Sequence, residues 1–340
     1  MYRKTVFHQF VLIACATVLF TASDQNGLAQ TVVKQEREFK FQYGATIKAL
    51  PEGAKVQVWV PIPASDSHQS AELIQFESEG QLEQHADEKY GNKIGYFELT
   101  AGDRGESTFA FTYQVARKEA GADGAVELSD QQKARFLAAN RLVPVDGRPT
   151  ELLDGEGELP SEPTVAAAKL YDLVEKHMTY DKSKPGYGKG DSVWACDSKT
   201  GNCTDFHSLF ISLARSKSLP ARFEIGFPLP TDRTEGAIGG YHCWAWFFAK
   251  GKGWAPVDIS EADKHPELKD YYFGKLTPDR IAFSTGRDIK LVPESSAGPL
   301  NYFVYPHVEV DGKQWPKEKI ELAFSFKDIE SEASVSDSKK

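Results

Sequence analysis

The sequence lacks several features that would decide its class at once. Its 340 residues contain no run of lysine and arginine, and the formal net charge is −9. A basic surface for nucleic acid is therefore not indicated. Internal repeats are absent, and after the N-terminal segment no stretch is apolar enough to span a bilayer, which needs about 20 residues. With 41% hydrophobic and 26% charged residues, the chain has the composition of a globular protein.

The first 29 residues have the pattern of a secretory signal peptide. The positive pair Arg3-Lys4 precedes a mostly apolar segment at 6–22, and Gly27-Leu28-Ala29 supplies the small residues that a signal peptidase reads. We expect cleavage before Gln30, a periplasmic or secreted protein, and no stable membrane span afterwards. Two alternatives stay open, namely an uncleaved N-terminal anchor and lipid attachment at Cys15.

Cysteine is scarce, and cleavage would leave only Cys196, Cys203 and Cys243. An odd number in an exported protein leaves one thiol free or paired outside the chain. No Cys-x-x-Cys spacing is present, so zinc held by these residues and His242 is a weak alternative, and we expect no metal or cofactor. His242 and Cys243 are neighbours on a predicted strand and would point to opposite faces. This disfavours a Cys203–Cys243 disulfide and leaves a Cys196–Cys243 bond open.

Hydrophobic patterning divides the rest of the chain. Short alternating strands separated by turn residues predict a small antiparallel β-sandwich over residues 30–118. Residues 119–162 are polar and glycine-rich and predict a linker that packs over the next domain, with one short helix at 130–140. A second domain is expected at 163–327, and the polar tail 328–340 is expected to be disordered.

The second domain centres on the stretch Gly201-Asn202-Cys203-Thr204-Asp205-Phe206-His207. Asn202 is a suitable N-cap for a helix that starts at the cysteine. A helix start has unpaired backbone N–H groups and the positive end of the helix dipole, and both favour a thiolate. The apolar residues that follow at helical spacing predict one buried stripe, formed by Phe206, Leu209, Phe210, Leu213 and Ala214.

A predicted hairpin over 241–258 supplies two further polar residues. With Lys250 at its centre, His242 faces Asp258 on one side of the sheet, with Cβ atoms about 5 Å apart. The carboxylate would hold one imidazole nitrogen while the other points at Cys203. A one-residue slip would separate the two side chains, and a two-residue shift would leave them diagonal. The spacing is thus compatible with a Cys203–His242–Asp258 triad without requiring it.

Such a triad has a defined chemistry. A thiolate attacks a carbonyl carbon, an imidazolium protonates the leaving group, and a carboxylate orients the imidazole. The backbone N–H of Cys203 would be one oxyanion donor, and that of Trp194 is predicted as the second. Simpler roles remain for each residue: a structural thiol, a packed histidine and a helix-capping Asp258. His207 is a rival base, although four residues after Cys203 on one helix it would be awkward to orient.

Three blocks of the sequence resemble the transglutaminase-like superfamily of bacterial cysteine enzymes. They are Gly201–Phe206 with the following Leu219–Arg222, then Tyr241–Trp244, then Trp254–Asp258, and their order is more specific than any single block. The resemblance implies an α+β, papain-like core, preceded here by the sandwich, with Cys203, His242 and Asp258 as the triad. Family members cross-link Gln to Lys, hydrolyse amide bonds or deamidate, and some have lost activity. No clustered carboxylates argue for the calcium sites of animal transglutaminases.

We therefore expect an exported thiol enzyme that acts on an amide carbonyl of a peptide or protein. Hydrolysis or deamidation is favoured over Gln–Lys cross-linking, because nothing in the sequence marks an amine site. The alternative is a non-enzymatic cell-envelope binding protein with a vestigial triad. A buried Cys203 sulfur, or a His242 turned away from it, would favour that alternative.

Overall fold

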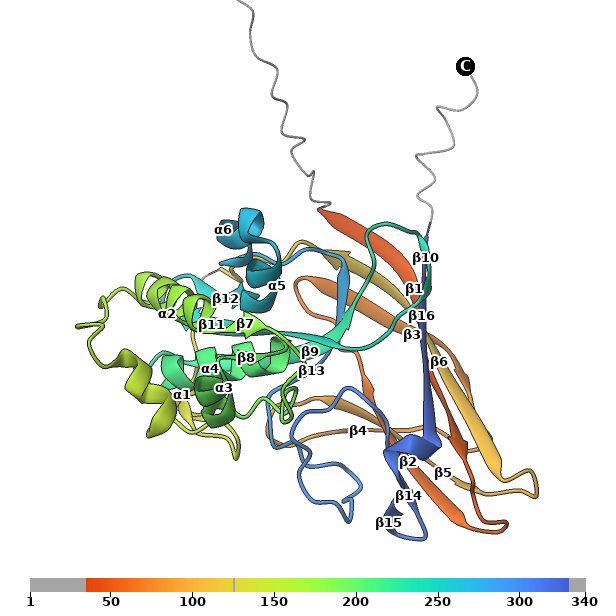
Figure 1. Ribbon diagram of the computed structural model, residues 1–340. Helices are drawn as coiled ribbons and strands as arrows, with labels where there is room; N and C mark the ends of the chain where they lie inside the picture. The colour runs from red at the N-terminus through yellow and green to blue at the C-terminus, as the bar shows by residue number, and fades with distance from the viewer. Residues whose placement is uncertain (1–34, 125, 330–340) are drawn as a thin grey trace, which may run out of the picture. The chain divides into compact units, whose positions relative to one another are not determined.

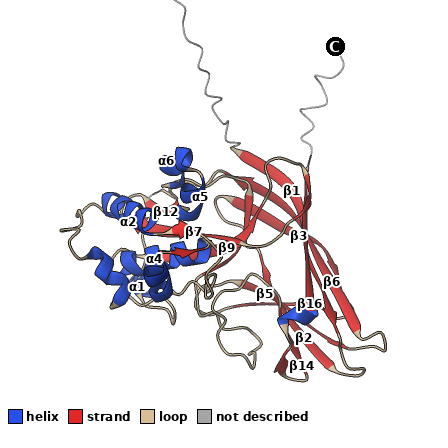
Figure 2. Cartoon of the chain, viewed as in Figure 1, coloured by secondary structure: helices blue, strands red, loops and turns tan. Residues whose placement is uncertain are grey.

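The computed structural model describes residues 35–124 and 126–329, and its fold class is α+β, as predicted (Figures 1 and 2). The signal peptide expected at 1–29 and residues 330–340 of the expected tail lie outside the described residues. Within the described ranges, no helix has both the length and the apolar character needed to cross a membrane.

Two five-stranded antiparallel sheets form the expected sandwich, with strand orders β10-β16-β1-β6-β3 and β15-β14-β2-β5-β4. In β1, Phe39, Phe41 and Tyr43 are buried while the residues between them are exposed, which is the period-two pattern of a half-buried strand. The strands contributed by the first part of the chain are β1 (Glu36–Lys48), β2 (Lys55–Ile62), β3 (Gln69–Glu77), β4 (Glu83–Ala86), β5 (Lys93–Thr100) and β6 (Glu106–Lys118).

The end of the chain completes this sandwich. Strand β14 (His307–Val310) pairs with β2, and β16 (Ile320–Asp328) pairs with β1 along its whole length. The sandwich also takes in the short strands β10 (Glu235–Ala237) and β15 (Lys313–Gln314). The boundaries at 118, 162 and 327 stay a prediction, but these pairings are a feature that sequence patterning did not indicate.

The second antiparallel layer is a four-stranded sheet ordered β12-β11-β9-β13. One face of β11 carries Cys243, Ala245 and Phe247 and packs with helix α4, while the other face carries Trp244 and Trp246 in a separate cluster. The helices and strands that follow the linker in the chain, apart from those of the sandwich, are α2 (Pro163–His177), β7 (Thr179–Tyr180), α3 (Ser192–Ser198), β8 (Thr200–Gly201), α4 (Cys203–Ser216), β9 (Ala221–Pro228), β11 (His242–Ala249), β12 (Gly253–Val257), α5 (Ile259–Lys264), η2 (Pro266–Leu268), α6 (Lys269–Tyr272), β13 (Arg280–Thr285) and η3 (Lys317–Lys319).

The predicted linker runs beside this sheet. It contains the expected short helix, α1 (Asp130–Leu137), which begins with a capping box between Ser129 and Gln132, and a 3₁₀ helix, η1 (Arg148–Leu153). The backbone N–H of Asp123 donates to the carbonyl of Trp254 in β12. Backbone hydrogen bonds therefore hold this segment against the layer that carries the candidate site.

Candidate active site

Helix α4 starts at Cys203, as the sequence predicts. The Asn202 side chain accepts from the Thr204 N–H at 2.9 Å, and the Asp205 carboxylate accepts from the Asn202 N–H at 2.9 Å. This reciprocal capping box fixes the first turn. Cys203 is the first helical residue, so its own N–H belongs to the set that has no partner within a helix.

The rest of α4 is more deeply enclosed than one apolar stripe predicts. Every residue from Cys203 to Arg215 is buried. Its polar residues are paired rather than solvated: Asp205 accepts from the N–H groups of Gly188 and Gly190, and Arg215 donates to the Ala221 carbonyl. The prediction of a single buried face was therefore too narrow, because hydrogen-bond partners allow polar residues on the other faces to be buried as well.

The hairpin that presents His242 and Asp258 has a different register from the predicted one. Ala245 pairs with Val257 and Ala249 with Gly253, so the connection is the three residues 250–252. The direct His242–Asp258 opposition is thus wrong by two residues, since the turn is centred on Gly251, whose φ of 79° suits glycine. The two side chains still meet, with His242 Nε2 2.7 Å from Asp258 Oδ2, because Asp258 lies beyond β12 at the start of α5.

Both carboxylate oxygens of Asp258 accept hydrogen bonds. Its Oδ1 accepts from the Ser260 hydroxyl and the Glu261 N–H, which caps α5. Its Oδ2 accepts from the Arg280 guanidinium at 2.9 Å as well as from His242. Burial acts to raise the pKa of Asp258, but His242 and Arg280 outweigh it and hold that pKa far below its usual range. The carboxylate is therefore ionised, and its position is set by several donors.

Arg280 is a site residue that sequence reasoning missed. It is 3% exposed, and its guanidinium lies over the Trp244 ring, 4.9 Å from the ring centroid. The available signal was a charged residue at the start of the otherwise apolar segment Arg280-Ile281-Ala282-Phe283. A charge in a buried strand needs a partner, and here that partner is Asp258.

The side chains of His242 and Cys243 lie beside the Cys203 thiol and lower its pKa through hydrogen bonding. Burial acts to raise the pKa of Cys203, but these two hydrogen bonds and the charge of His242 outweigh it and bring that pKa well below its usual value. For His242, burial acts to lower the pKa, and Asp258 and Cys203 together raise it to about 10. Between the two pKa values the pair exists as thiolate and imidazolium.

Cys243 lies closer to Cys203 than strand alternation predicts. Alternation does place His242 with Trp244, with ring centroids 6.0 Å apart, and Cys243 on the face that packs with α4. However, His242 is the first residue of β11, and at the strand end both side chains reach Cys203. The expectation that Cys243 points away is therefore wrong. None of the three cysteines in the described ranges forms a disulfide: Cys196, Cys203 and Cys243 are all free and buried.

His207 is engaged elsewhere. Its Nε2 accepts from the backbone N–H of Ile259 at 3.1 Å, which places the ring proton on Nδ1, 3.6 Å from the Cys243 sulfur. Burial is the main cause that lowers the pKa of His207 to about 4. A neutral ring held in this way orients the neighbouring backbone and thiol, and it is poorly suited to act as the base for Cys203.

The predicted second oxyanion donor finds no support in the structure. The backbone N–H of Trp194 donates to Asp191 Oδ1 at 3.2 Å as part of the α3 cap, so it is already engaged. A different polar group contacts the residues on either side of Cys203: the Tyr241 hydroxyl lies 2.9 Å from Thr204 Oγ1 and 3.1 Å from Asn202 Nδ2. As for the zinc alternative, the described part of the chain gathers no group of three or more His, Cys, Asp or Glu residues suited to hold a metal ion.

One part of the chain is similar to a known family. Residues 155–259, which include Cys203, His242 and Asp258, match the family model described as the transglutaminase-like superfamily. The chain carries a transglutaminase-like core. The resemblance predicted from three short sequence blocks is thus confirmed, and with it the coarse expectation of a family of cysteine enzymes.

Similarity to other proteins extends beyond residues 155–259. An uncharacterized protein of Haemophilus influenzae is 28% identical over 308 residues, which cover 77% of this chain and 83% of that protein. The transglutaminase-like fold is also similar to a solved structure described as a "putative cysteine protease" from Cytophaga hutchinsonii, with a TM-score of 0.54, 15% identity, and coverage of 86% of this chain and 99% of that one. A weaker similarity, with a TM-score of 0.36 and 15% identity over 69% of this chain and 92% of that chain, is to the periplasmic domain of TgpA from Pseudomonas aeruginosa.

Proposed function

We propose that this protein is a thiol enzyme that attacks the amide carbonyl of peptides or proteins, with Cys203 as nucleophile, His242 as acid and base, and Asp258 as the orienting carboxylate. One observation carries the proposal. His242 donates through Nε2 to Asp258 at 2.7 Å, and the same imidazole acts on Cys203, at the start of α4, to lower the pKa of its thiol. That arrangement matches the roles of the three groups in acyl transfer.

The reaction follows from these positions. The Cys203 thiolate forms a bond to the carbonyl carbon, and the oxygen takes up the electron pair near the N–H groups at the helix start. The C–N bond then breaks as His242 gives its proton to the leaving nitrogen, which departs as ammonia from Gln or as an amine from a peptide bond. Water attacks the thioester, His242 accepts a proton from it, and the acid is released with the thiolate restored.

Hydrolysis or deamidation is preferred here over Gln–Lys cross-linking, because no feature of the site marks a place for an amine. Export to the periplasm or beyond, directed by residues 1–29, is part of the proposal. Apart from the attacking water, the steps use only groups of this chain.

The binding-protein alternative has one observation on its side. Cys203 is only 2% exposed, and a buried sulfur was expected of a vestigial site. Against it, His242 faces Cys203 rather than turning away, and burial alone would keep the thiol neutral. We give the orientation more weight, because the hydrogen bonds act against burial and favour the reactive form.

Thiol labelling tests the proposal directly. We expect iodoacetamide to modify Cys203 at pH 7 in the wild-type chain and in Cys196→Ala, a control that removes another buried cysteine, and we expect no reaction in the folded Cys203→Ala variant. Mass spectrometry of the peptides identifies the labelled site. Equal total labelling of Cys203→Ala and wild type would contradict the assignment.

A second assay separates the reaction types. Gln-containing peptides incubated with wild type should release ammonia and gain the mass change of Gln to Glu, or be cleaved, and Cys203→Ala should do neither. Added primary amine should appear in the product only if the chain cross-links. A wild-type chain that labels at Cys203 yet alters no peptide would favour the binding-protein alternative.

A further inference from the structure

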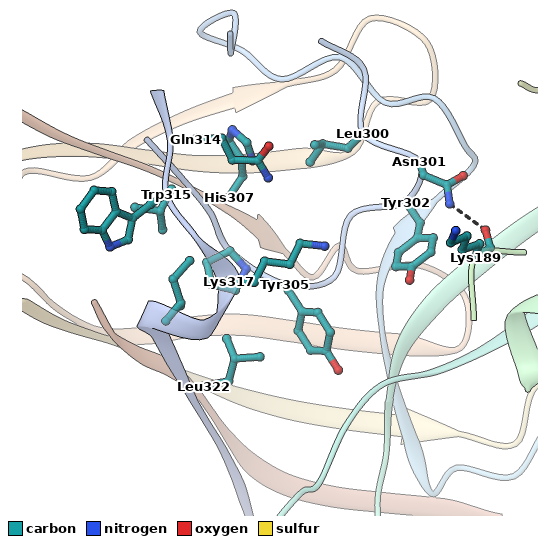
Figure 3. A pocket seen from close by; sticks show the side chains of 13 residues that line it. Lys189, Leu300, Asn301, Tyr302, Tyr305, His307, Gln314, Trp315, Lys317 and Leu322 are labelled. Atoms are coloured by element: carbon teal, nitrogen blue, oxygen red, sulfur yellow. Dashed lines mark hydrogen bonds between the residues drawn. The ribbon is translucent and has the colours of Figure 1, made fainter. Parts of the chain in front are cut away.

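A cavity of about 450 Å³ lies next to the candidate active site, and its role is so far unassigned. Figure 3 shows Trp315 on one side of it and Tyr302 and Tyr305 on the other. The start of β16 adds Ile320 and Leu322, and Leu322 is 38% exposed although it is apolar. The lining is thus mainly aromatic and aliphatic, and its size suits one or two large side chains.

Two tyrosines connect this cavity to the segments that hold the nucleophile. The Tyr302 hydroxyl donates to the Gly188 carbonyl, and the Gly188 N–H is bound by Asp205 in the first turn of α4. The Tyr305 hydroxyl accepts from the backbone N–H of Tyr241, the residue before His242. The Tyr241 ring also packs against both, with centroids 5.7 Å from Tyr302 and 5.8 Å from Tyr305. The cavity and the site therefore share a wall.

The charged side chains that line the cavity are all basic. None of its lining residues is acidic, and two, Lys189 and Lys317, are lysines that form no ion pair with any described carboxylate. Among the other polar residues of the lining, Asn301 donates to the Lys189 carbonyl, and His307 is bonded to Ser295. The two ammonium groups are therefore the free charges that a ligand would meet, and they favour an anion.

The edge of β16 adds a backbone feature. Ile238 donates to the Phe324 carbonyl at 2.9 Å, so the polar groups of Phe324 face β10 and away from β1. The direction of hydrogen bonding alternates along an antiparallel strand, so Leu322, two residues before Phe324, presents its N–H and C=O on the same edge of β16 as Phe324 does. None of the described strands pairs with Leu322 on that edge. An extended peptide can bind to such an edge.

We propose that this cavity, lined by Tyr302, Tyr305, Trp315 and Leu322, binds the segment of an acidic peptide substrate that flanks the reacting amide. A large apolar side chain enters the cavity, and a neighbouring carboxylate meets Lys189 and Lys317. This inference rests on the proposed function and adds the substrate class. It predicts that the enzyme prefers amides close to an apolar–acidic pair and discriminates against the same peptide with a basic residue.

Binding to folded Cys203→Ala tests the cavity without requiring turnover. The probes are acetyl-Gly-Gln-Phe-Glu-Gly-amide, the same peptide with Ser in place of Phe, and the same peptide with Lys in place of Glu. A second set places Glu-Phe before Gln, because the chain direction is not fixed by the cavity. Calorimetric titration should give at least about tenfold tighter binding for Phe-Glu, in one set, than for either replacement.

Reversing the charge of one lysine then tests whether the preference for the Glu peptide arises in this cavity. In the Cys203→Ala background, Lys317→Glu should weaken binding of the Glu peptide by about tenfold and improve binding of the Lys peptide. Lys290→Glu makes the same charge change at a surface lysine outside this cavity and should leave the ratio unaltered. Both lysines are exposed, so an unchanged melting temperature is expected and checks the fold. Leu322→Ser should weaken binding of the Phe peptide but not of the Ser peptide.

The remaining outcomes contradict the inference or a part of it. Binding within twofold for all peptides of both sets, no binding at millimolar concentration, or equal effects of Lys317→Glu and Lys290→Glu would overturn the inference. If Phe matters and Glu and Lys bind equally, the acidic class is wrong. Failure of the proposed function would show separately, as a wild-type chain that is inert to iodoacetamide and to all amides, since peptide binding is measured on the variant without the thiol.

Discussion

Helices α3 and α4 each bury one cysteine, yet the two thiols are in opposite electrostatic states. Both helices have a side-chain cap, Asp191 for α3 and Asn202 for α4. Cys196 lies in the interior of α3 with its sulfur 3.7 Å from the Arg148 carbonyl, and burial is the main cause that raises its pKa. Cys203 is the first residue of α4, and its pKa is lowered although it too is buried.

The contrast between the two cysteines shows which contribution determines the pKa of a buried thiol. A helix start stabilises an anion by only about 0.3–1 kcal/mol, less than the cost of burying a thiolate. What α3 lacks is a hydrogen-bonded cation, which α4 receives from His242, itself kept protonated by Asp258. The position in the helix therefore favours Cys203, but the imidazolium reverses the effect of burial.

Removing that cation should make Cys203 resemble Cys196. In His242→Ala we expect iodoacetamide labelling of Cys203 at pH 7 to slow by at least about thirtyfold, because a thiol with the ordinary pKa of about 8.5 is only about 3% thiolate at that pH. The rate should recover as the pH is raised. His265→Ala, a change at an exposed histidine near α5, is the control and should label like wild type.

Wild type supplies the matching pH test. The raised pKa of His242, about 10, means that the imidazolium is present below that pH and is lost above it. Amide turnover should therefore fall as the pH rises through about 10, whereas labelling of the thiolate should not. Labelling that stays equally fast in His242→Ala and wild type at pH 7 would show that the imidazolium does not hold the thiolate.

A smaller effect is expected one step further out, at Arg280. Arg280→Met leaves the buried Asp258 without one of its cations, which should lower the free energy of unfolding by about 3 kcal/mol and the labelling rate by several-fold. The control is Arg222→Met, since Arg222 also stacks on tryptophan rings, those of Trp246 and Trp254, but forms no ion pair with Asp258.

The pH dependence separates positioning from general destabilisation. The pKa of Asp258 is depressed in the fold, so it contributes stability above its unfolded pKa that is lost as the pH falls through the folded pKa. Removing the Arg280 charge raises the folded pKa, so Arg280→Met should lose stability at a higher pH than wild type on acidification. A parallel acid profile for both proteins would remove Arg280 from the site.

The sequence was most informative where chemistry depends on neighbours in the chain. Asn202 before Cys203 predicts the cap and the helix start, because capping involves residues within one turn. The residue types of the triad could also be named, since Cys203, His242 and Asp258 stand beside recognisable blocks. In contrast, their geometry depended on a turn whose length alternation does not fix, and the predicted register was two residues away from the observed one.

Contacts between distant segments were the least predictable. Alternation shows that β16 is a strand with one buried face, but many edges would accept such a strand, and only the fold pairs it with β1. Arg280 reaches Asp258 through a different strand, and Cys243 approaches Cys203 because β11 begins beside it. Such contacts have no local pattern, so the contacts that Arg280 and Cys243 make at the site were missed, whereas Cys203 could be proposed as the nucleophile from its neighbours in the chain.

The smallest predicted change concerns Cys243, which differs from Cys196 in that its thiol is hydrogen-bonded to Cys203. Burial raises the pKa of Cys243, so it remains a neutral S–H that can donate to the thiolate. Cys243→Ala should raise the pKa of Cys203 and slow labelling at pH 6 by about two- to fourfold, and Cys243→Ser should restore most of the rate by supplying a hydroxyl donor. Cys196→Ala, which leaves a similar small cavity away from the site, should not alter the pH profile. If Cys243→Ala and Cys196→Ala slow labelling equally, the effect arises from packing, and the hydrogen bond between the two thiols does not tune the nucleophile.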